Sequence, residues 1–327
     1  MNDLPEPLIP PLIQPLIRQR ADPHISRHAD GFYYFIASVP AYDRIELRRA
    51  PTVEGLAEAP AYVAWRKPDA GAWSELIWAP ELHFNQGAWY VYFAASHTRA
   101  LDHLGMFQHR MYALRNTAAD PFTGEWEFLG QVDSGIDSFC LDATTFTHRG
   151  QLYYLWAQKD PDPAIAGNSN LYIAPMKTPW QLAGAPVLLS RPEFDWECRG
   201  FLVNEGPSVL QRHGRVFISY SASATDENYA MGLLWADENA DLLDPTSWHK
   251  SAEPVMRSCA EDSVFGPGHN SFTVTDKPDE VLLVYHARTY TEIEGDPLWN
   301  PDRHTFVKPL RWSAEGMPVF GKPSRRD

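Results

Sequence analysis

Five polar residues recur along the chain at nearly even intervals, and each stands at the start of an apolar stretch rich in aromatic residues. They are Asp22, Glu81, Asp142, Glu205 and His269, and successive intervals are 59, 61, 63 and 64 residues. Glu205 lies in FLVNEGPSVL, with apolar residues on both sides. A carboxyl in such surroundings is seldom buried without a partner, and burial raises its pKa toward the range of an acid catalyst. The chemistry to consider first is therefore proton transfer by carboxyl groups.

Glycoside hydrolysis matches this set of residues, because it needs one protonated carboxyl and one ionised carboxylate on opposite sides of the scissile bond. Glu205 fits the acid that gives a proton to the leaving oxygen. Asp22 lies beside Arg20 and His24 in the sequence, and their positive charge would keep it ionised as the base that activates water. Asp142 would tune the pKa of Glu205 by its charge and hold the sugar. Structural ion pairs also perturb pKa values, so the spacing alone leaves a structural network open as the alternative.

The stretches that carry these residues share one template, in which a strand, a tight turn and an aromatic-rich second strand follow the polar residue. The turns read HADG, NQG, HRG, RHG and DKPDE, which are typical of β-hairpins. Further strand candidates follow each hairpin, including IELRRA, HRMYALRN, SNLYIAPM, YAMGLLWAD and HTFVKPLRW. Four strands per unit at a period of about 60 residues predict an all-β, five-bladed β-propeller. A β-sandwich is the alternative, but it gives no reason for an even period.

In a propeller the first strand of each blade lines the central axis. Because the five polar residues start these strands, we expect them to meet in a ring at one end of the channel. Four carboxylates in one funnel repel each other, and some of their pKa values must rise.

Composition limits the classes of partner and compartment. The chain has 327 residues, a formal net charge of −14, 12 Trp and three Cys. The acidic net charge argues against nucleic acid as a partner, and no apolar run is long enough for a membrane span. Three widely spaced cysteines and a Pro-rich N-terminus without a basic start predict a cytoplasmic protein.

We expect residues 1–20 to form an extended arm and residues 21–327 to form a single propeller domain.

Seven stretches of the chain together resemble a known family of enzymes. They are RADPHI (20–25), IWAPELH (77–83), LDATTF (141–146), VNEGPSV (203–209), GPGHNSF (266–272), VYHAR (284–288) and RHTFVKPLRW (303–312). In their order and content they resemble glycoside hydrolase family 43, and within it the α-L-arabinofuranosidases. The resemblance implies a five-bladed propeller that cleaves with inversion, with Asp22 as general base, Glu205 as general acid and Asp142 as the acid that modulates the pKa and orients the substrate. Inversion implies that the carboxyls of the general acid and the general base lie about 6.5–9.5 Å apart, which leaves room for a water molecule.

Four more residues are candidates for binding the sugar. The resemblance places Arg288 in the funnel, where it would bind hydroxyls and hold a catalytic carboxyl; the alternative is a salt bridge within the blade. Trp78 and Phe35 could form an apolar floor under the sugar, although most aromatic residues of such a chain are core. His269 would lie at the channel centre, near calcium bound through waters, or serve only as a core histidine. Glu81 we interpret as a structural or supporting acid. No cofactor is required by this chemistry.

These observations predict an enzyme that releases terminal α-L-arabinofuranosyl residues from arabino-oligosaccharides. A cytoplasmic location would imply short imported substrates. A β-xylosidase is the alternative within the family, where such enzymes often carry a C-terminal β-sandwich that this chain lacks after its fifth unit. A non-catalytic sugar-binding propeller is the alternative outside catalysis, and it would be expected to lose one of the three acids. The sequence does not determine an oligomeric state.

Overall fold

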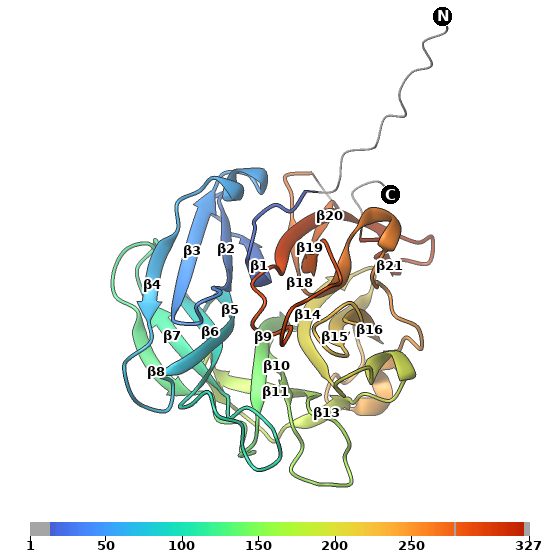
Figure 1. Cartoon of the computed structure of the whole chain (residues 1–327). Helices are drawn as coiled ribbons and strands as arrows, with labels where there is room; N and C mark the ends of the chain where they lie inside the picture. The colour runs from blue at the N-terminus through green and yellow to red at the C-terminus, as the bar shows by residue number, and fades with distance from the viewer. Residues whose placement is uncertain (1–13, 278, 324–327) are drawn as a thin grey trace, which may run out of the picture.

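The chain folds into five antiparallel sheets arranged around a central axis, as the computed structural model of residues 14–277 and 279–323 describes it (Figure 1). Blade 1 contains β1 (Ala21–Arg27), β2 (Tyr33–Ser38), β3 (Arg44–Ala50) and β4 (Tyr62–Arg66). Blade 2 contains β5 (Glu75–Asn85), β6 (Ala88–Ser96), β7 (Arg110–Asn116) and β8 (Glu127–Gln131). Blade 3 contains β9 (Cys140–His148), β10 (Gln151–Gln158), β11 (Asn170–Thr178), β12 (Gln181–Leu182) and β13 (Val187–Ser190). The five-bladed prediction is confirmed.

The last two blades complete the ring. Blade 4 contains β14 (Asn204–Arg212), β15 (Arg215–Ala222), β16 (Ala230–Asp237) and β17 (His249–Lys250). Blade 5 contains β18 (Phe265–Val274), β19 (Val281–Arg288), β20 (His304–Trp312) and β21 (Pro318–Val319). Four short 3-10 turns interrupt the loops: η1 (Glu54–Ala57), η2 (Asp195–Glu197), η3 (Pro245–Ser247) and η4 (Ala260–Asp262). No helix among the described residues is long and apolar enough to cross a membrane.

The hairpins form because their turns contain residues suited to a left-handed backbone. Among the described residues, three inner hairpins have two consecutive turn residues with positive φ, at Gln86-Gly87, Arg149-Gly150 and His213-Gly214. Two consecutive residues of this kind make a type I′ turn, whose twist matches the twist of the two strands. The sequence stretches NQG, HRG and RHG thus fix the register of β5 with β6, β9 with β10 and β14 with β15.

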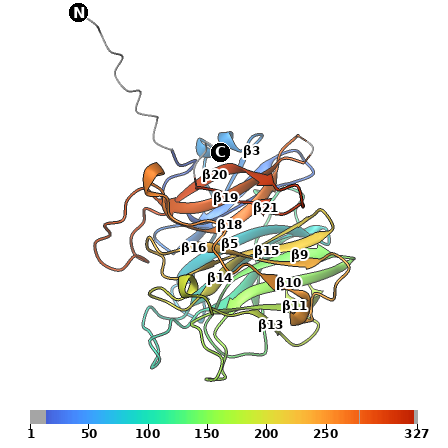
Figure 2. The same cartoon turned by 90° about the vertical axis from the view of Figure 1, so that its right-hand side faces the viewer.

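The inner strands β1, β5, β9, β14 and β18 surround the axis, as both views of the molecule indicate (Figures 1 and 2). The ring closes where β1 of blade 1 lies against β18 of blade 5. Ser271 on β18 fastens this closure, because its Oγ donates to the Pro23 carbonyl at 2.9 Å and accepts from the Ile25 N–H at 3.2 Å. Ile17 adds a bridge from the preceding segment to Thr305 of β20.

Packing between the blades accounts for the aromatic content of the chain. Consecutive residues of a strand point to opposite faces, yet both Tyr92 and Phe93 on β6 are fully buried, because each blade has a neighbour on both sides. The predicted arm falls mainly on residues outside the described part of the chain, and its end at Ile17 is held to blade 5 as described above.

Candidate active site

Each inner strand carries a β-bulge near its first residues, where one residue has a left-handed backbone. The five residues are Asp22, Ala79, Asp142, Gly206 and His269, with φ between 43° and 57°. The register of every inner hairpin shifts at this point. A left-handed non-glycine residue costs free energy, and bulges commonly re-aim side chains at active sites. The repeat therefore builds a ring of redirected residues at one end of the channel.

This ring corrects the alignment of the five polar residues expected from the sequence. Asp22, Asp142 and His269 occupy the left-handed position. Glu205 precedes it by one residue and Glu81 follows it by two, with Ala79 and Gly206 in the ring position itself. The period in the sequence was found from polar side chains. The feature that repeats in the structure is instead a left-handed backbone conformation, which Ala79 and Gly206 also adopt.

Asp22 lies at the centre of a dense polar network and is almost fully buried. Its Oδ1 lies 3.3 Å from His269 Nδ1, 3.3 Å from His286 Nδ1 and 3.5 Å from the Arg303 guanidinium. Its Oδ2 accepts a hydrogen bond of 2.5 Å from Ser38 Oγ. Burial opposes ionisation, but His269, Arg303 and His286 outweigh it and hold the pKa of Asp22 below its ordinary value. Asp22 is therefore the ionised carboxylate of the site.

The positive charge beside Asp22 comes from Arg303 and not from its sequence neighbours. Burial lowers the pKa of both His269 and His286, so the imidazoles are neutral at neutral pH and Arg303 carries the lasting charge. Arg20, expected to serve this purpose, bonds Glu46 at 2.8 Å. The expectation from sequence adjacency is corrected: residues two apart in a regular strand share a face, but the bulge at Asp22 breaks this alternation and turns its side chain away from that of Arg20.

Asp142, which is buried, and Glu205, which is half-buried, are carboxyl groups on neighbouring blades. Burial raises the pKa of Glu205 to about 7; the hydrogen bond from Tyr229 lowers it and the charge of Asp22 raises it. Burial, together with the charges of Glu205 and Asp22, also raises the pKa of Asp142. Asp142 Oδ2 accepts the Gly206 N–H at 3.0 Å, and Glu205 Oε1 accepts from the Tyr229 hydroxyl at 2.9 Å. Such a pair titrates as a unit and retains a proton near neutral pH.

Four residues of this network were not singled out from the sequence. Arg303 and His286 stand within RHTFVKPLRW and VYHAR, two stretches that carry the family resemblance, so a signal for them was present. Tyr229 precedes β16 and Ser38 ends β2, and neither stands in a repeated pattern of the sequence. Their roles follow only from side-chain contacts within a blade, Ser38 with Asp22 in blade 1 and Tyr229 with Glu205 in blade 4.

Arg288 is placed differently from the expectation. Its guanidinium donates to the carbonyl of Thr225, to the Pro297 carbonyl at 2.7 Å and to Asn300 Oδ1 at 3.2 Å. None of its hydrogen bonds reaches Asp142 or Glu205. Arg288 instead ties together two loops at this end of the propeller, and Arg303 occupies the place beside the carboxylate.

The two aromatic candidates have different surroundings. Phe35 is 2% exposed and packs with Ile25 and Val284 between blades 1 and 5, which places it in the core and not under a sugar. Trp78 stacks on His109 with ring centroids 3.8 Å apart and meets the ring of Tyr42 at 6.0 Å. Its buried Nε1 has no hydrogen-bond partner. Trp78 thus adjoins the network through Tyr42, whose hydroxyl accepts from Arg303 at 3.1 Å.

The surroundings of His269 bear on the expected calcium ion. The Nδ1 atom of His269 faces Asp22 at 3.3 Å and Asp142 at 3.6 Å. Calcium takes six to eight oxygen ligands, and the guanidinium of Arg303 stands beside the same oxygen of Asp22. That positive charge makes this side of the ring a poor calcium site. Calcium bound through waters elsewhere in the channel stays a prediction.

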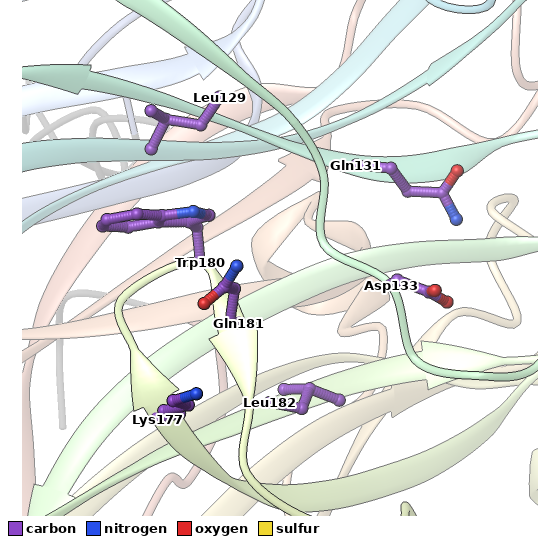
Figure 3. Close-up of a pocket in the computed structure, with 7 residues that line it drawn as sticks. All are labelled: Leu129, Gln131, Asp133, Lys177, Trp180, Gln181 and Leu182. Atoms are coloured by element: carbon purple, nitrogen blue, oxygen red, sulfur yellow. The ribbon is translucent and has the colours of Figure 1, made fainter.

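A separate hollow of about 480 Å³ lies at the outer edge of blades 2 and 3 (Figure 3). Its walls come from β8 and from the turn between β11 and β12, and they comprise Leu129, Gln131, Asp133, Lys177, Trp180, Gln181 and Leu182. None of the site residues expected from the sequence lines it.

Comparison with known proteins gives a consistent picture. The model of the family described as glycosyl hydrolases family 43 matches residues 13–318. The chain is 49% identical over 309 residues to an extracellular exo-α-(1→5)-L-arabinofuranosidase of Streptomyces avermitilis, covering 94% of this chain and 63% of that protein. A relative of the same name from Streptomyces chartreusis is 50% identical, with 88% and 85% covered. The crystal structure of an α-L-arabinofuranosidase from Lactobacillus brevis has a TM-score of 0.93 at 57% identity, covering 97% and 98%.

The chain spans less than two thirds of the length of the Streptomyces avermitilis relative. The prediction of a cytoplasmic protein is wrong by this comparison, because both Streptomyces relatives are named extracellular. The inference of short imported substrates rested on that compartment and is withdrawn with it.

Proposed function

The chain belongs to glycosyl hydrolases family 43, and we propose that it releases terminal α-L-arabinofuranosyl residues from arabino-oligosaccharides by inverting acid/base catalysis. The observation that carries the proposal is the division of protonation states within one buried network. Asp22 has a lowered pKa, whereas burial raises the pKa of Glu205 to about 7. An enzyme that uses one carboxyl as acid and another as base at the same pH needs a high pKa for the first and a low pKa for the second.

In the proposed reaction Glu205 donates its proton to the glycosidic oxygen as the bond from that oxygen to the anomeric carbon breaks. Asp22 takes a proton from a water molecule, which attacks the anomeric carbon from the opposite face of the sugar. The products are the free alcohol and arabinofuranose of inverted configuration. Glu205 ends ionised and Asp22 protonated, and exchange of protons with solvent restores both.

Asp142 has a positioning role in this scheme. It accepts the N–H of Gly206, the residue that follows Glu205, so it orients the backbone that carries the acid. Its proximity also disfavours a second negative charge on the pair, which keeps the proton on the site until substrate arrives. Acid and base both come from the chain, so the proposal includes no cofactor in bond cleavage.

The choice of arabinose rests on the relatives, which are named α-L-arabinofuranosidases. The test is turnover of 4-nitrophenyl α-L-arabinofuranoside and 4-nitrophenyl β-D-xyloside by the purified protein. We expect kcat/KM for the arabinoside to exceed that for the xyloside by at least 100-fold. A preference for the xyloside would overturn the substrate, and no turnover of either would overturn the activity.

The proposed acid predicts how activity depends on pH. The pKa of Glu205 is about 7, so its proton is lost above that pH, and kcat/KM for phenyl α-L-arabinofuranoside should fall as pH rises through about 7. Replacing Tyr229 with Phe removes a hydrogen bond that lowers the pKa of Glu205, so the fall should move to higher pH. The control is Tyr62→Phe, on β4 of blade 1. A fall that stays in place or moves to lower pH in Tyr229→Phe would contradict the role of Glu205.

An exposed tryptophan is linked to the proposed base through two intervening side chains, Tyr42 and Arg303. Trp299, in the loop between β19 and β20, is 46% exposed, and its ring lies 6.0 Å from that of Tyr42 and 6.5 Å from that of Phe107. Tyr42 in turn accepts a hydrogen bond from Arg303, the partner of Asp22. An exposed aromatic face beside a buried acid/base network is suited to stacking against a sugar.

Because its ring is exposed whereas the acid/base network lies deeper, we expect Trp299 to support a sugar unit of an oligosaccharide outside the arabinofuranosyl group that reacts. The variant Trp299→Ala should raise KM for arabino-oligosaccharides about 10-fold, a change worth ~1.4 kcal/mol, while kcat/KM for 4-nitrophenyl α-L-arabinofuranoside changes much less. The matched control is Val319→Ala on β21, where Val319 is 44% exposed. An equal loss on both substrates would show that Trp299 only maintains the loop.

A further inference from the structure

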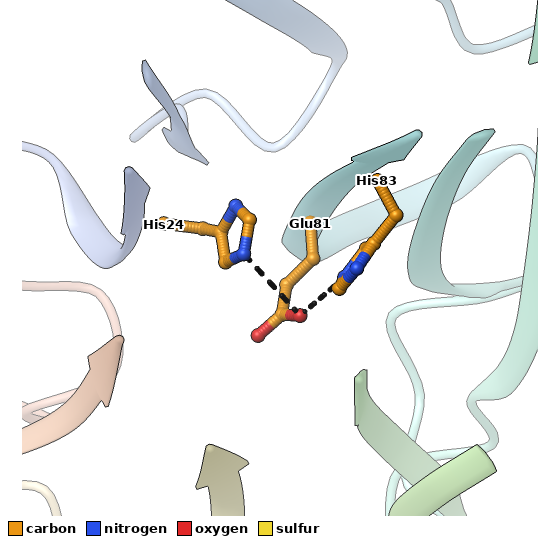
Figure 4. Close-up of side chains that lie close together, drawn as sticks. All are labelled: His24, Glu81 and His83. Atoms are coloured by element: carbon orange, nitrogen blue, oxygen red, sulfur yellow. Dashed lines mark hydrogen bonds and ion pairs between the residues drawn. The ribbon is translucent and has the colours of Figure 1, made fainter. Parts of the chain in front are cut away.

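Two histidines and a glutamate converge where blades 1 and 2 meet. His24 lies on β1, and Glu81 and His83 lie on β5 (Figure 4). Glu81 Oε2 is 2.8 Å from His83 Nε2 and 3.9 Å from His24 Nε2. One ligand atom from each residue lies within 4.8 Å of the other two. The three side chains thus point at a common space from two different blades.

Glu81 is hydrogen-bonded to His83 and Thr144, whereas the bonding of His24 is incomplete without a further partner. Glu81 is 6% exposed, yet its only ion pairs in the described part of the chain are with the two histidines. Buried acids are normally paired with a lasting positive charge. The Nδ1 atom of His24 is buried without a hydrogen bond, and its Nε2 is too far from Glu81 for one. An imidazole without hydrogen bonds therefore faces a carboxylate without a lysine or arginine.

The spacing of the three groups fits a small dication. Ligands about 2.1 Å from a tetrahedral zinc ion stand about 3.4 Å from each other. The separations from Glu81 to His83 and to His24, 2.8 Å and 3.9 Å, lie on either side of that value. Shifts of side chains below about 1 Å would seat the ion. Two imidazoles and one carboxylate favour zinc and neighbouring transition metals, whereas calcium and magnesium prefer oxygen alone.

A surface pocket gives solvent a path to the cluster. It has a volume of about 390 Å³, and its walls include His24, His83, His28, Phe84 and Trp89. Strand β1 starts at the carboxylate ring with Ala21 and Asp22 and runs away from it to Arg27, so the pocket lies toward the other end of the channel. Water in this pocket is available as the fourth ligand.

We propose that His24, Glu81 and His83 bind a divalent transition metal ion of the zinc class, with water as the fourth ligand, and that the ion joins blade 1 to blade 2. The site is separate from the three carboxyls of the proposed reaction. It also differs from calcium near His269 in its ligands and in the metal it selects. The role of the ion is structural, because no acid or base of the proposed chemistry is among the ligands.

The test is titration of the metal-free protein with Zn²⁺ by calorimetry and with Co²⁺ by visible absorption. We expect one equivalent of Zn²⁺ with micromolar or tighter Kd, an intense Co²⁺ spectrum of tetrahedral type, and no comparable binding of Ca²⁺. Saturation with Zn²⁺ should raise Tm by about 5 °C. In His24→Ala and His83→Ala the Kd should weaken at least 100-fold and the Tm shift should disappear. The matched control is the double variant His97→Ala/His103→Ala, which removes two exposed histidines outside the site and should leave the Kd for Zn²⁺ and the Tm shift unchanged.

A measurement on the unaltered protein covers the case in which a variant fails to fold. Crystals soaked in Zn²⁺ should show one anomalous peak among His24, Glu81 and His83 at the zinc absorption edge. Binding that survives in both single variants, Ca²⁺ bound more tightly than Zn²⁺, or no anomalous peak at the cluster would each overturn the proposal. The readouts are metal binding and Tm, so failure of the proposed hydrolase activity would leave their meaning unchanged.

Discussion

Replacing Glu205 with Gln is expected to lower kcat/KM for phenyl α-L-arabinofuranoside about 10³-fold, within the range that general acid catalysis contributes. The amide has nearly the same shape but no proton to give to the leaving oxygen. A dinitrophenyl leaving group is stable as an anion and does not need that proton, so its arabinofuranoside should lose less than about 10-fold in the same variant. The measurement is kcat/KM for the two substrates side by side.

The matched control for this experiment is Glu125→Gln, at an exposed position with no role in the network. It should leave both rates unchanged. Equal losses on the two substrates in Glu205→Gln would show that the residue acts on something other than the leaving group. Unchanged rates would remove Glu205 from the mechanism.

The second large effect is expected from Asp22→Asn, which removes the proposed base. The loss should be about 10³-fold or more for both leaving groups, because attack by water is needed whatever group departs. Sodium azide, a nucleophile that needs no base, should restore part of the turnover and yield an arabinosyl azide of inverted configuration. An azide product of retained configuration, or full activity without azide, would contradict the assignment.

A stability measurement must accompany Asp22→Asn. The substitution leaves the buried guanidinium of Arg303 without its carboxylate, and breaking a buried pair in this way costs about 3–5 kcal/mol of unfolding free energy. The variant must therefore be assayed well below its measured Tm. The control Asp69→Asn, at an exposed position, should change neither Tm nor activity.

The five-bladed architecture could be predicted from the sequence because its signals are local. A tight turn such as Arg149-Gly150 depends on two residues that can be recognised in the sequence. An aromatic-rich second strand follows each of these turns. A near-constant period then requires equivalent units around an axis. The bounds of the third strands also follow to within one residue, since the predicted IELRRA and HRMYALRN correspond closely to β3 and β7.

The register of the site could not be predicted as readily. The repeated feature is a left-handed residue in a bulge, and Ala79 and Gly206 adopt it as well as Asp22. Side-chain chemistry therefore marks only some of the equivalent positions. Glu205 and Glu81 stand beside that position in sequence, and alignment by charge alone shifted them into it.

The residues that sequence analysis missed or misplaced lie outside the inner strands. Arg303 reaches Asp22 from the position directly before blade 5's third strand, a contact between residues 281 positions apart. Arg288 was expected in the funnel because it ends VYHAR, one of the stretches that carry the family resemblance, yet loop carbonyls accept its hydrogen bonds. Contacts between residues so far apart in the sequence depend on how the blades pack against each other. They produce no repeated pattern in the sequence from which they could be predicted.

Asp22 and Glu205 are proposed to act from opposite faces of an arabinofuranosyl group in a single displacement. The most direct measurement is proton NMR of the first sugar released from 4-nitrophenyl α-L-arabinofuranoside, recorded before mutarotation. We expect β-L-arabinofuranose to appear first and the α anomer to grow in afterwards. Initial release of α-L-arabinofuranose would contradict it, because retention requires a covalent intermediate that this arrangement of acid and base does not form.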